Sequence, residues 1–348
     1  MDKAFWSRFF ASSSGRNLQS KIQNLQFLLV LGVALLASAA FGQTTRLKAG
    51  YSTIAVGQSL VWVTKEAGIF KENGLDVELL FIGSSTLATQ ALIAGDVPFV
   101  IMSGATAINS SLAGSDLVMV TSTKKDPAQA FLVTAKEIRE PSQLRGKKLG
   151  VSRLGASSDF LLRYLLKRIG LNPDKDVSIV QVGSSPVRMA ALANGAIDGT
   201  ALTFEEMMVG KKMGFNILLD ITQLGIEALN SDLVTTRRFI RNSRETVQRF
   251  VKAMVKAVQV YTSDKQFSME VIAKYTKSRD MEKIELGYDY NAKMYLKKPY
   301  PAIKGIQFAL EELGERNPAA KTAKPEQFME ISFVRELDES GYIDSLYK

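Results

Sequence analysis

The sequence predicts an α/β protein with two lobes, each built on a mostly parallel sheet that helices flank. The first observation is length, because 348 residues exceed one ordinary small domain and suffice for two sizeable cores. The second is that predicted strands and helices alternate, which is typical of parallel sheets covered on both faces. The third is a repeat. Residues 83–95 read GSSTLATQALIAG and residues 183–195 read GSSPVRMAALANG, so the Gly-Ser-Ser, the Ala-Leu and the final Gly recur 100 positions apart.

The first half of the chain begins the alternation directly after residue 45. Apolar residues that alternate or run together predict strands at 46–52, 75–83 and 97–103, and helical spacing predicts helices at 58–70, 86–94 and 104–114. Ser84 and Ser85 are suited to cap the second of these helices, and Gly95 to end it. Strand and helix follow one another three times, which predicts one parallel sheet.

The same order begins again at residue 147. The pattern predicts strands at 147–152, 177–183 and 197–202 and helices at 159–170 and 186–195. At an offset of 100 positions, Gly50 matches Gly150, Ser52 matches Ser152 and Ile69 matches Ile169. The matches gather at strand ends and helix starts, so we expect two similar lobes.

Two further strands, one within 130–146 and one at 231–239, bracket the second half of the repeat. They predict a double crossover in which residues 43–135 form the first part of lobe 1, residues 136–230 form an inserted lobe 2, and residues 231–348 return to lobe 1 as C-terminal helices. The return is expected to open with a helix on which Asn242 and Glu245 form a capping pair.

The N-terminal segment has the pattern of an export signal. Basic residues precede the uncharged run FLLVLGVALLASAAF at 27–41, and small residues suitable for cleavage follow. We expect residues 1–42 to be a signal peptide, cut after Ala39 or Gly42, and the mature protein to reside in the periplasm. The alternative is an uncleaved membrane anchor, for which a run of fifteen residues is short.

Composition excludes much enzymology. The chain has no histidine and no cysteine, which removes imidazole bases, thiolate nucleophiles, disulfides and ordinary zinc sites. Neither an EF-hand nor a Walker A, GxGxxG or GxSxG pattern occurs in a fitting context, and an S-x-x-K tetrad at Ser122 and Lys125 lacks its companion motifs. We therefore expect no enzyme, no metal and no cofactor. The net charge of +9 is dispersed, and its one cluster at 237–244 is typical of a solvated helix start rather than a nucleic-acid site.

Ligands of open parallel sheets bind beyond the carboxyl ends of the strands, where both Gly-Ser-Ser stretches fall. Glycine permits close backbone approach, serine offers a hydroxyl, and the first N–H groups of a helix carry partial positive charge. Arg153 is the one fixed cation among the candidates and would pair with an anion, unless it is a surface arginine; Glu205 would favour a cationic or hydrogen-bond-donating group, unless it forms a surface salt bridge. The candidate ligand-binding residues are Ser52, Thr53, Ser84, Ser85, Thr86, Ser103, Gly104, Ala105, Arg153, Ala156, Ser157, Ser158, Ser184, Ser185, Thr203 and Glu205.

Three blocks carry a family resemblance: GIFKENGLDVEL at 68–79, ALIAGDV at 91–97 and LRGKKLGV at 144–151. Over residues 46–262 the chain resembles the extracytoplasmic solute-binding proteins of ABC importers, and within them the nitrate, sulfonate and taurine branch, which includes proteins that bind the thiamine pyrimidine precursor. Pro98 stands where the family usually has an acidic residue, whereas the second block keeps Asp198.

The resemblance implies the periplasmic binding protein fold, with two lobes joined by two hinge strands. It also implies capture of a small-molecule ligand by hinge closure and delivery to an ABC permease in the inner membrane. We further expect a monomer and, from the dispersed charge, no nucleic-acid partner. Two alternatives remain: an enzyme of the menaquinone-pathway dehydratase type, and a ligand-sensing module for a membrane receptor. Nitrate, an alkyl sulfonate, an aromatic carboxylate and a neutral pyrimidine all remain candidate ligands.

Overall fold

The structure is a computed structural model that describes residues 44–124 and 130–348. The expected signal peptide and Lys125 of the S-x-x-K tetrad lie outside the described residues. Chain contacts separate residues 1–44 from 45–348, and the account below concerns the second unit. Within the described ranges, no helix combines the length and apolar character needed to cross a bilayer.

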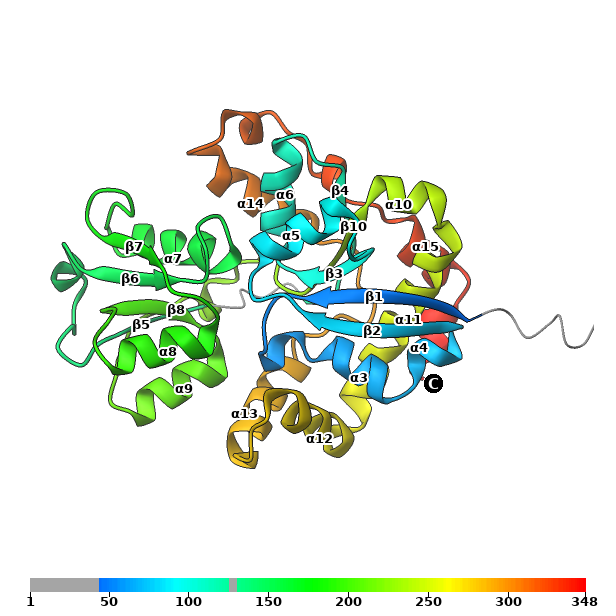
Figure 1. The fold of residues 1–348 in the computed structure, drawn as a ribbon, viewed down its shortest axis with the longest axis horizontal. Coiled ribbons are helices and arrows are strands. Elements are labelled where there is room, and N and C mark those ends of the chain that lie inside the picture. The colour runs from blue at the N-terminus through cyan, green and yellow to red at the C-terminus, as the bar shows by residue number, and fades with distance from the viewer. Residues whose placement is uncertain (1–43, 125–129) are drawn as a thin grey trace, which may run out of the picture. The chain divides into compact units, whose positions relative to one another are not determined.

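The first sheet has five strands in the order β2-β1-β3-β10-β4 (Figure 1). β1 is parallel to β2 and β3, whereas β10 runs antiparallel to both β3 and β4. The chain therefore returns after a long excursion to insert one strand of opposite direction. The strands are β1 (Thr45–Tyr51), β2 (Leu75–Phe81), β3 (Phe99–Met102), β4 (Leu117–Ser122) and β10 (Asp232–Thr236).

The second sheet repeats this plan in the order β7-β6-β8-β5-β9. Here β5 is the antiparallel strand, paired with β8 and β9, while β6 is parallel to β7 and β8. The sheet begins at Phe131, ahead of the expected boundary at residue 135. The strands are β5 (Phe131–Thr134), β6 (Lys148–Val151), β7 (Ser178–Gln181), β8 (Gly199–Leu202) and β9 (Asn216–Asp220).

The matched glycines Gly50 and Gly150 lie in β1 and β6, the second strand of each sheet. A Cβ atom at Gly50 would lie 2.8 Å from Ile82 Cδ1, and one at Gly150 would lie 2.6 Å from Ile197 Cδ1. Both contacts are too close for a close-packed interior. At this position the repeat therefore has a packing cause rather than a ligand-binding one.

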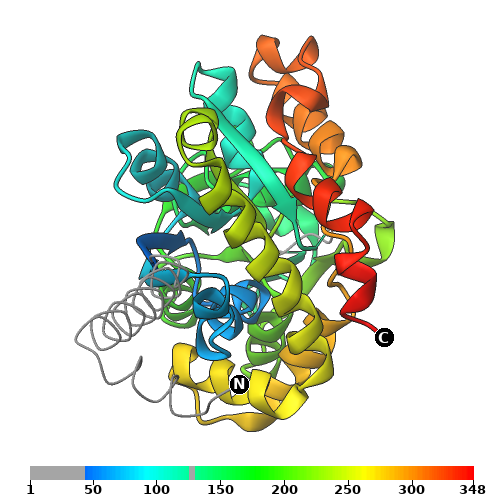
Figure 2. The same ribbon diagram turned by 90° about the vertical axis from the view of Figure 1, so that its right-hand side faces the viewer.

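Apolar side chains from both faces of the first sheet form two separate clusters, one centred on α3 and α11 and the other on α5, α6 and α14. Trp62, Phe99 and Phe250 are fully buried in the first cluster. Figure 2 shows α11 beside the C-terminal helix α15, which packs on it. The helices are α3 (Leu60–Glu66), α4 (Ile69–Glu72), α5 (Ser85–Ala94), α6 (Gly104–Leu112), α10 (Arg237–Asn242), α11 (Arg244–Ser263), α12 (Lys265–Thr276), α13 (Met281–Ala292), α14 (Ile303–Gly314), α15 (Ser332–Glu339) and α16 (Tyr342–Ser345).

The second sheet has its own core, formed with three helices. Figure 1 shows α7 on one side of the sheet and α8 and α9 on the other. These helices are α7 (Ser157–Arg168), α8 (Ser185–Ala193) and α9 (Phe204–Lys212), and the short 3-10 helices of the chain are η1 (Val56–Gln58), η2 (Pro141–Leu144), η3 (Thr222–Leu224), η4 (Pro318–Lys321) and η5 (Pro325–Phe328).

Two helical predictions were wrong in detail. The helix expected at 58–70 is divided among η1, α3 and α4. η1 ends at Gln58, and Gly68 adopts a left-handed φ of 73° that breaks the ladder between α3 and α4. The capping pair expected at Asn242 and Glu245 does not form: Asn242 ends α10, Ser243 is the N-cap of α11, and Glu245 pairs instead with Arg249 at 2.5 Å.

Candidate functional site

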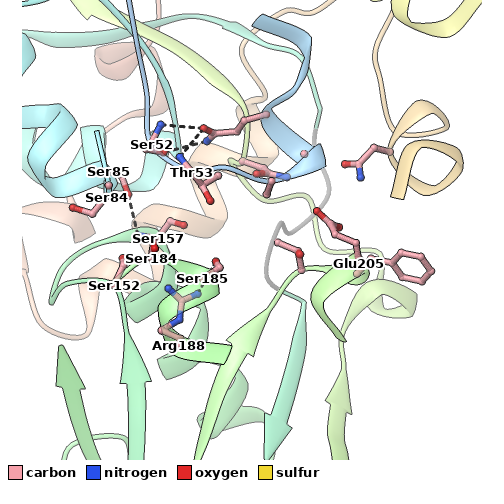
Figure 3. A pocket seen from close by; sticks show the side chains of 18 of the residues that line it. Ser52, Thr53, Ser84, Ser85, Ser152, Ser157, Ser184, Ser185, Arg188 and Glu205 are labelled. Atoms are coloured by element: carbon pink, nitrogen blue, oxygen red, sulfur yellow. Dashed lines mark hydrogen bonds between the residues drawn. The ribbon is translucent and has the colours of Figure 1, made fainter. Parts of the chain in front are cut away.

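A pocket lies where loops of the two sheets meet, at the carboxyl ends of β1, β2, β6, β7 and β8. Its cavity volume is about 40 Å³, room for a few water molecules. Figure 3 shows its serines, Arg188 and Glu205. The lining residues are Ser52, Thr53, Ala55, Gly57, Gln58, Gly83, Ser84, Ser85, Ser152, Ser157, Ser184, Ser185, Arg188, Thr203, Phe204, Glu205, Asn230, Tyr290 and Asn291.

The two Gly-Ser-Ser stretches meet at this pocket from opposite sheets. Ser84 is the N-cap of α5, and its hydroxyl accepts a hydrogen bond from Leu87 N at 3.2 Å. Ser184 and Ser185 stand at the start of α8. A third helix start joins them, because the Ser157 N–H at the head of α7 donates to Ser85 Oγ at 3.2 Å (Figure 3). Three helix N-termini, each with partial positive charge, therefore surround one space.

Arg188 places a full positive charge at the pocket, below Ser184 and Ser185 in Figure 3. The side chain is 1% exposed and donates to four groups: Thr200 Oγ1 at 2.9 Å, Gly183 O at 2.9 Å, Ser185 Oγ at 3.1 Å and Ala201 O at 3.3 Å. All four are uncharged. Burial lowers the pKa of the guanidinium to about 10, so it remains charged at neutral pH.

Sequence reasoning missed Arg188, although the repeat held a signal. The matching position in the first half is Ala88, which is fully buried on the inner face of α5. Burying a charge without a partner is costly. An arginine at a position whose counterpart in the repeat is a buried alanine therefore indicates a function for the charge. Comparing residue types at matched positions would have found it.

Glu205 lies in the first turn of α9, and Figure 3 shows it across the pocket from the serines. Its Oε1 accepts a hydrogen bond from Val56 N at 3.0 Å, which joins the second sheet's helix layer to a loop of the first. Burial, and then the neighbouring Glu206 carboxylate, raise the pKa of Glu205. Beside it, the ring of Phe204 stacks on that of Tyr290 with 4.4 Å between centroids.

The loop after β1 is held by side chains that also line the pocket. Gln58 Oε1 accepts from Ser52 N at 3.1 Å and from Thr53 N at 3.2 Å, and Gln58 Nε2 donates to Ser52 Oγ. In the second half of the repeat, Ser158 Oγ replaces the Gln58 amide oxygen, because it accepts a hydrogen bond from Ser152 N at 2.8 Å. The Ser158 hydroxyl is therefore used inside the lobe.

Nine of the sixteen predicted ligand-binding residues line the pocket and seven do not. Arg153 is exposed, the hydroxyl of Ser158 bonds within its own lobe, and Ala156 is the buried N-cap residue of α7. The nine are Ser52, Thr53, Ser84, Ser85, Ser157, Ser184, Ser185, Thr203 and Glu205; the seven are Thr86, Ser103, Gly104, Ala105, Arg153, Ala156 and Ser158. Prediction missed Ala55, Gly57, Gln58, Gly83, Ser152, Arg188, Phe204, Asn230, Tyr290 and Asn291.

The start of α6 is already capped by a carboxyl group of the chain itself. Gly104 N donates to Asp232 Oδ2 at 2.8 Å, and Ser122 Oγ donates to Asp232 Oδ1 at 2.5 Å. Ser103 Oγ donates to Leu229 O at 2.9 Å. A carboxyl group from β10 therefore accepts the hydrogen bond of this helix N-terminus, where the sequence predicted a ligand. For this reason Ser103 and Gly104 do not line the pocket.

Asp232 should make stability depend on pH. Burial raises its pKa to about 7, whereas an unfolded aspartate titrates near 4. Between these values the folded chain binds a proton that the unfolded chain has released, so the free energy of unfolding should fall as pH rises from about 4 to about 7. Asp232→Asn cannot titrate, and its amide keeps an acceptor for Gly104 N and a donor for Ser122 Oγ.

Calorimetric melting temperatures at fixed ionic strength check this prediction. From about pH 4 to about pH 7, the melting temperature of the wild type should fall steadily relative to that of Asp232→Asn. Asp220→Asn, at an exposed aspartate that ends β9, is the control and should show the wild-type pH dependence. A gap between wild type and Asp232→Asn that stays constant from pH 4 to 7 would contradict the prediction.

No group of three or more acidic side chains suitable for a metal ion occurs in the ranges 44–124 and 130–348. The chemistry that remains is hydrogen bonding by hydroxyls, amides and helix N–H groups, together with one cation and one carboxylate. Such a set can bind and orient a solute through hydrogen bonds and charge.

Comparison with known proteins agrees with this geometry. The family described as NMT1/THI5 like matches residues 59–266. A protein of Brucella abortus (strain 2308), named as a binding protein without a stated ligand, is 25% identical over 258 residues, which are 71% of this chain and 76% of the relative.

Two solved structures are similar in fold. The periplasmic nitrate-binding protein NrtA from Synechocystis PCC 6803 has a TM-score of 0.70 and 14% identity over 85% of this chain and 89% of its own. The alkanesulfonate-binding protein SsuA from Xanthomonas axonopodis pv. citri, bound to MOPS, has a TM-score of 0.67 and 16% identity over 83% of this chain and 99% of its own. With the two matching sheets, they confirm the expected periplasmic binding protein fold.

Proposed function

Because the chain belongs to the NMT1/THI5-like family, we propose that it is the solute-binding component of an importer and captures a small anionic solute in the pocket. Its fold is related to that of the substrate-binding proteins of ABC import systems. In this proposal the protein works outside the cytoplasm as a monomer, holds the solute between its lobes and delivers it to a permease in the inner membrane. It performs no reaction on the solute.

One observation carries the proposal: Arg188 is buried at a pocket that three helix starts also face. Its four acceptors are neutral, and the buried Glu206 carboxylate acts on its guanidinium through charge attraction without forming an ion pair among the described contacts. A buried guanidinium that no carboxylate contacts is unfavourable, and an anion in the pocket would supply a direct partner. Serine hydroxyls and helix N–H groups would complete its hydrogen bonds.

Contacts that cross between the lobes support closure around the solute. Ser157 N bonds to Ser85 Oγ, and Val56 N bonds to Glu205. At the edge formed by α7 and α14, Lys167 pairs with both Glu312 and Glu315, and Arg316 pairs with Asp174 at 2.6 Å. A solute that touches both lobes would favour the closed form through its greater affinity for that form. The two chain segments that join β4 to β5 and β9 to β10 would serve as the hinge.

The location and partner are inferred from different evidence. The N-terminal pattern of residues 1–42 is that of an export signal, and the similar structures are named as periplasmic or ligand-binding proteins. The absence of histidine and cysteine supports a binding role over an enzymatic one. Turnover of a solute during titration would instead favour the enzyme alternative.

Bulky residues at the paired serines should weaken solute binding without unfolding the protein. We expect Ser85→Leu and Ser185→Leu each to lower the affinity for the tightest anion in a panel of nitrate, sulfate, short sulfonates and short carboxylates at least tenfold, because the leucine fills the pocket. Isothermal titration calorimetry measures affinity, and the melting temperature without ligand reports the fold. Ser263→Leu, at the exposed end of α11, is the matched control.

If neither serine variant changes the affinity while both remain folded, the solute binds elsewhere and the proposal fails. A panel in which no member raises the melting temperature would also count against it, since a ligand at 100 times its Kd stabilises the protein by about 2.7 kcal/mol.

A further inference from the structure

A second contact between the lobes lies away from the pocket, where helix α7 of lobe 2 meets helix α14 of lobe 1. A cavity of about 640 Å³ lies beside the two helices. Among the described residues, none that lines this cavity also lines the pocket. We call this contact the α7–α14 seam; its residues are Phe160, Tyr164 and Lys167 of α7 and Phe308, Glu312 and Glu315 of the α14 side.

The apolar part of the seam is a wedge of three aromatic rings. The Phe308 ring stands nearly perpendicular to two rings of α7, with centroid distances of 5.8 Å to Phe160 and 5.0 Å to Tyr164. Phe160 belongs to lobe 2, yet it packs against the core cluster that α5, α6 and α14 form in lobe 1. Edge-to-face pairs stabilise a contact beyond the area that they bury. Separation of the lobes would therefore break both ring pairs and expose apolar surface on each side.

Ion pairs that join the two lobes adjoin the wedge. The Lys167 ammonium pairs with Glu312 and also with Glu315, the second at 2.9 Å. The side chains of Lys167 and Glu312 are only 26% and 19% exposed, so solvent and salt screen their attraction less than that of a fully exposed pair. Farther along, Arg316 pairs with Asp174 at 2.6 Å.

The seam is independent of what the pocket holds. Its contacts are made by the chain with itself, and its residues do not line the pocket, so they stabilise the closed form for any solute. The other contacts between the lobes, from Ser157 to Ser85 and from Val56 to Glu205, lie at the pocket. A solute held between the lobes leaves only when they part, and the seam contacts must then break.

We propose that the α7–α14 seam is a latch, which holds the lobes closed and sets how slowly the solute leaves. The inference rests on the proposed function for the closure of the lobes around a solute, and it adds residues that control release without touching the solute. Phe308 and Lys167 are the principal ones, because each contacts two partners across the seam. Weakening the seam should favour the open form and speed release, while the order of preference among solutes stays unchanged.

Dissociation rates of the tightest-binding probe from the anion panel test the latch by stopped-flow displacement. We expect Phe308→Ala to raise the rate roughly fivefold or more, and Lys167→Gln about threefold. Lys265→Gln is the matched control. The Lys265 ammonium also pairs with two carboxylates, those of Glu285 and Asp289, but all three residues lie in lobe 1. The control should release the probe at the wild-type rate.

A measurement without solute tests the same latch. The chain has no cysteine, so Lys175→Cys and Ala319→Cys, at exposed positions of lobe 2 and lobe 1, accept two spin labels specifically. Pulsed dipolar spectroscopy then measures the distance between the lobes. On this labelled background Phe308→Ala should lower the ratio of the closed to the open population roughly fivefold or more, and Lys265→Gln should leave the ratio unchanged.

The outcomes separate the latch from the proposed function. Folded Phe308→Ala and Lys167→Gln proteins with wild-type dissociation rates and wild-type label distances would overturn the latch and leave the proposed function standing, since the seam would then be a contact that never parts. A changed order of preference among the anions would also overturn it, because the seam would then act on the pocket itself. If no anion binds the wild type, the proposed function fails, and the label distances alone decide on the latch. Melting temperatures of all variants report whether the fold is kept.

Discussion

Replacing Arg188 by methionine should abolish high-affinity binding of the anionic solute. Methionine fills a similar volume but removes the only buried cation that lines the pocket among the described residues. Truncating one partner of a buried, hydrogen-bonded charge pair costs about 3 kcal/mol, so we expect affinity to fall roughly a hundredfold. Arg188→Lys keeps the charge without the planar fork and should give an intermediate loss.

Two controls separate this effect from a loss of fold. Arg153→Met makes the same change at an exposed arginine outside the pocket and should leave the affinity unchanged. Because Arg188 also holds Gly183 O and Thr200 Oγ1, the melting temperature of each variant is measured without solute. A folded Arg188→Met protein that binds within threefold of the wild type would show that the anion does not use this cation.

Gly104→Ala should cause a large loss of stability at a position with no role in the pocket. A Cβ atom there would lie 2.2 Å from Met119 Sδ, 3.0 Å from Leu229 Cδ1 and 3.1 Å from Asp232 Oδ2. Met119 is fully buried, so its side chain cannot move aside into water. Overpacking of this kind costs about 1–3 kcal/mol, and the weakened Asp232 cap adds to it. We expect a melting temperature several degrees lower, with solute affinity retained.

Gly83→Ala is the matched control, since a Cβ atom there meets nothing closer than 4.0 Å and stability should hardly change. Shortening Met119 to valine in the Gly104→Ala background should recover part of the loss, because it removes the atom in conflict. Equal melting temperatures for the wild type and Gly104→Ala would mean that α6 does not pack against β4 as described.

The sequence predicted the layers of the fold because alternating strands and helices leave local signals. Helix starts at Ser84 and Ser184 and the left-handed helix end at Gly95 are set by nearby residues. The break at Gly68 was missed because a single glycine within an otherwise helical pattern does not reveal whether its φ will be positive. Strands β4 and β9 were missed as well, although both carry short apolar runs.

The candidate site was harder to predict because it combines residues far apart in the chain. Tyr290 and Asn291 reach the pocket from α13, 85 residues or more after Glu205, and no pattern near them indicates this. At the start of α6 the opposite error occurred. Ser103 and Gly104 follow a strand and begin a helix, as the rule for ligand sites requires, yet they do not line the pocket. Asp232, which caps that helix from β10, comes 128 residues after Gly104. Local reasoning locates helix starts, and the tertiary structure decides which of them are free.

A crystal structure of the protein with the tightest-binding probe tests the central claim most directly. We predict the solute between the two lobes, its anionic group in contact with Arg188 and with serines of both Gly-Ser-Ser stretches, Ser84 or Ser85 on one side and Ser184 or Ser185 on the other. A solute bound to one lobe alone, or at a surface away from these serines, would contradict the account.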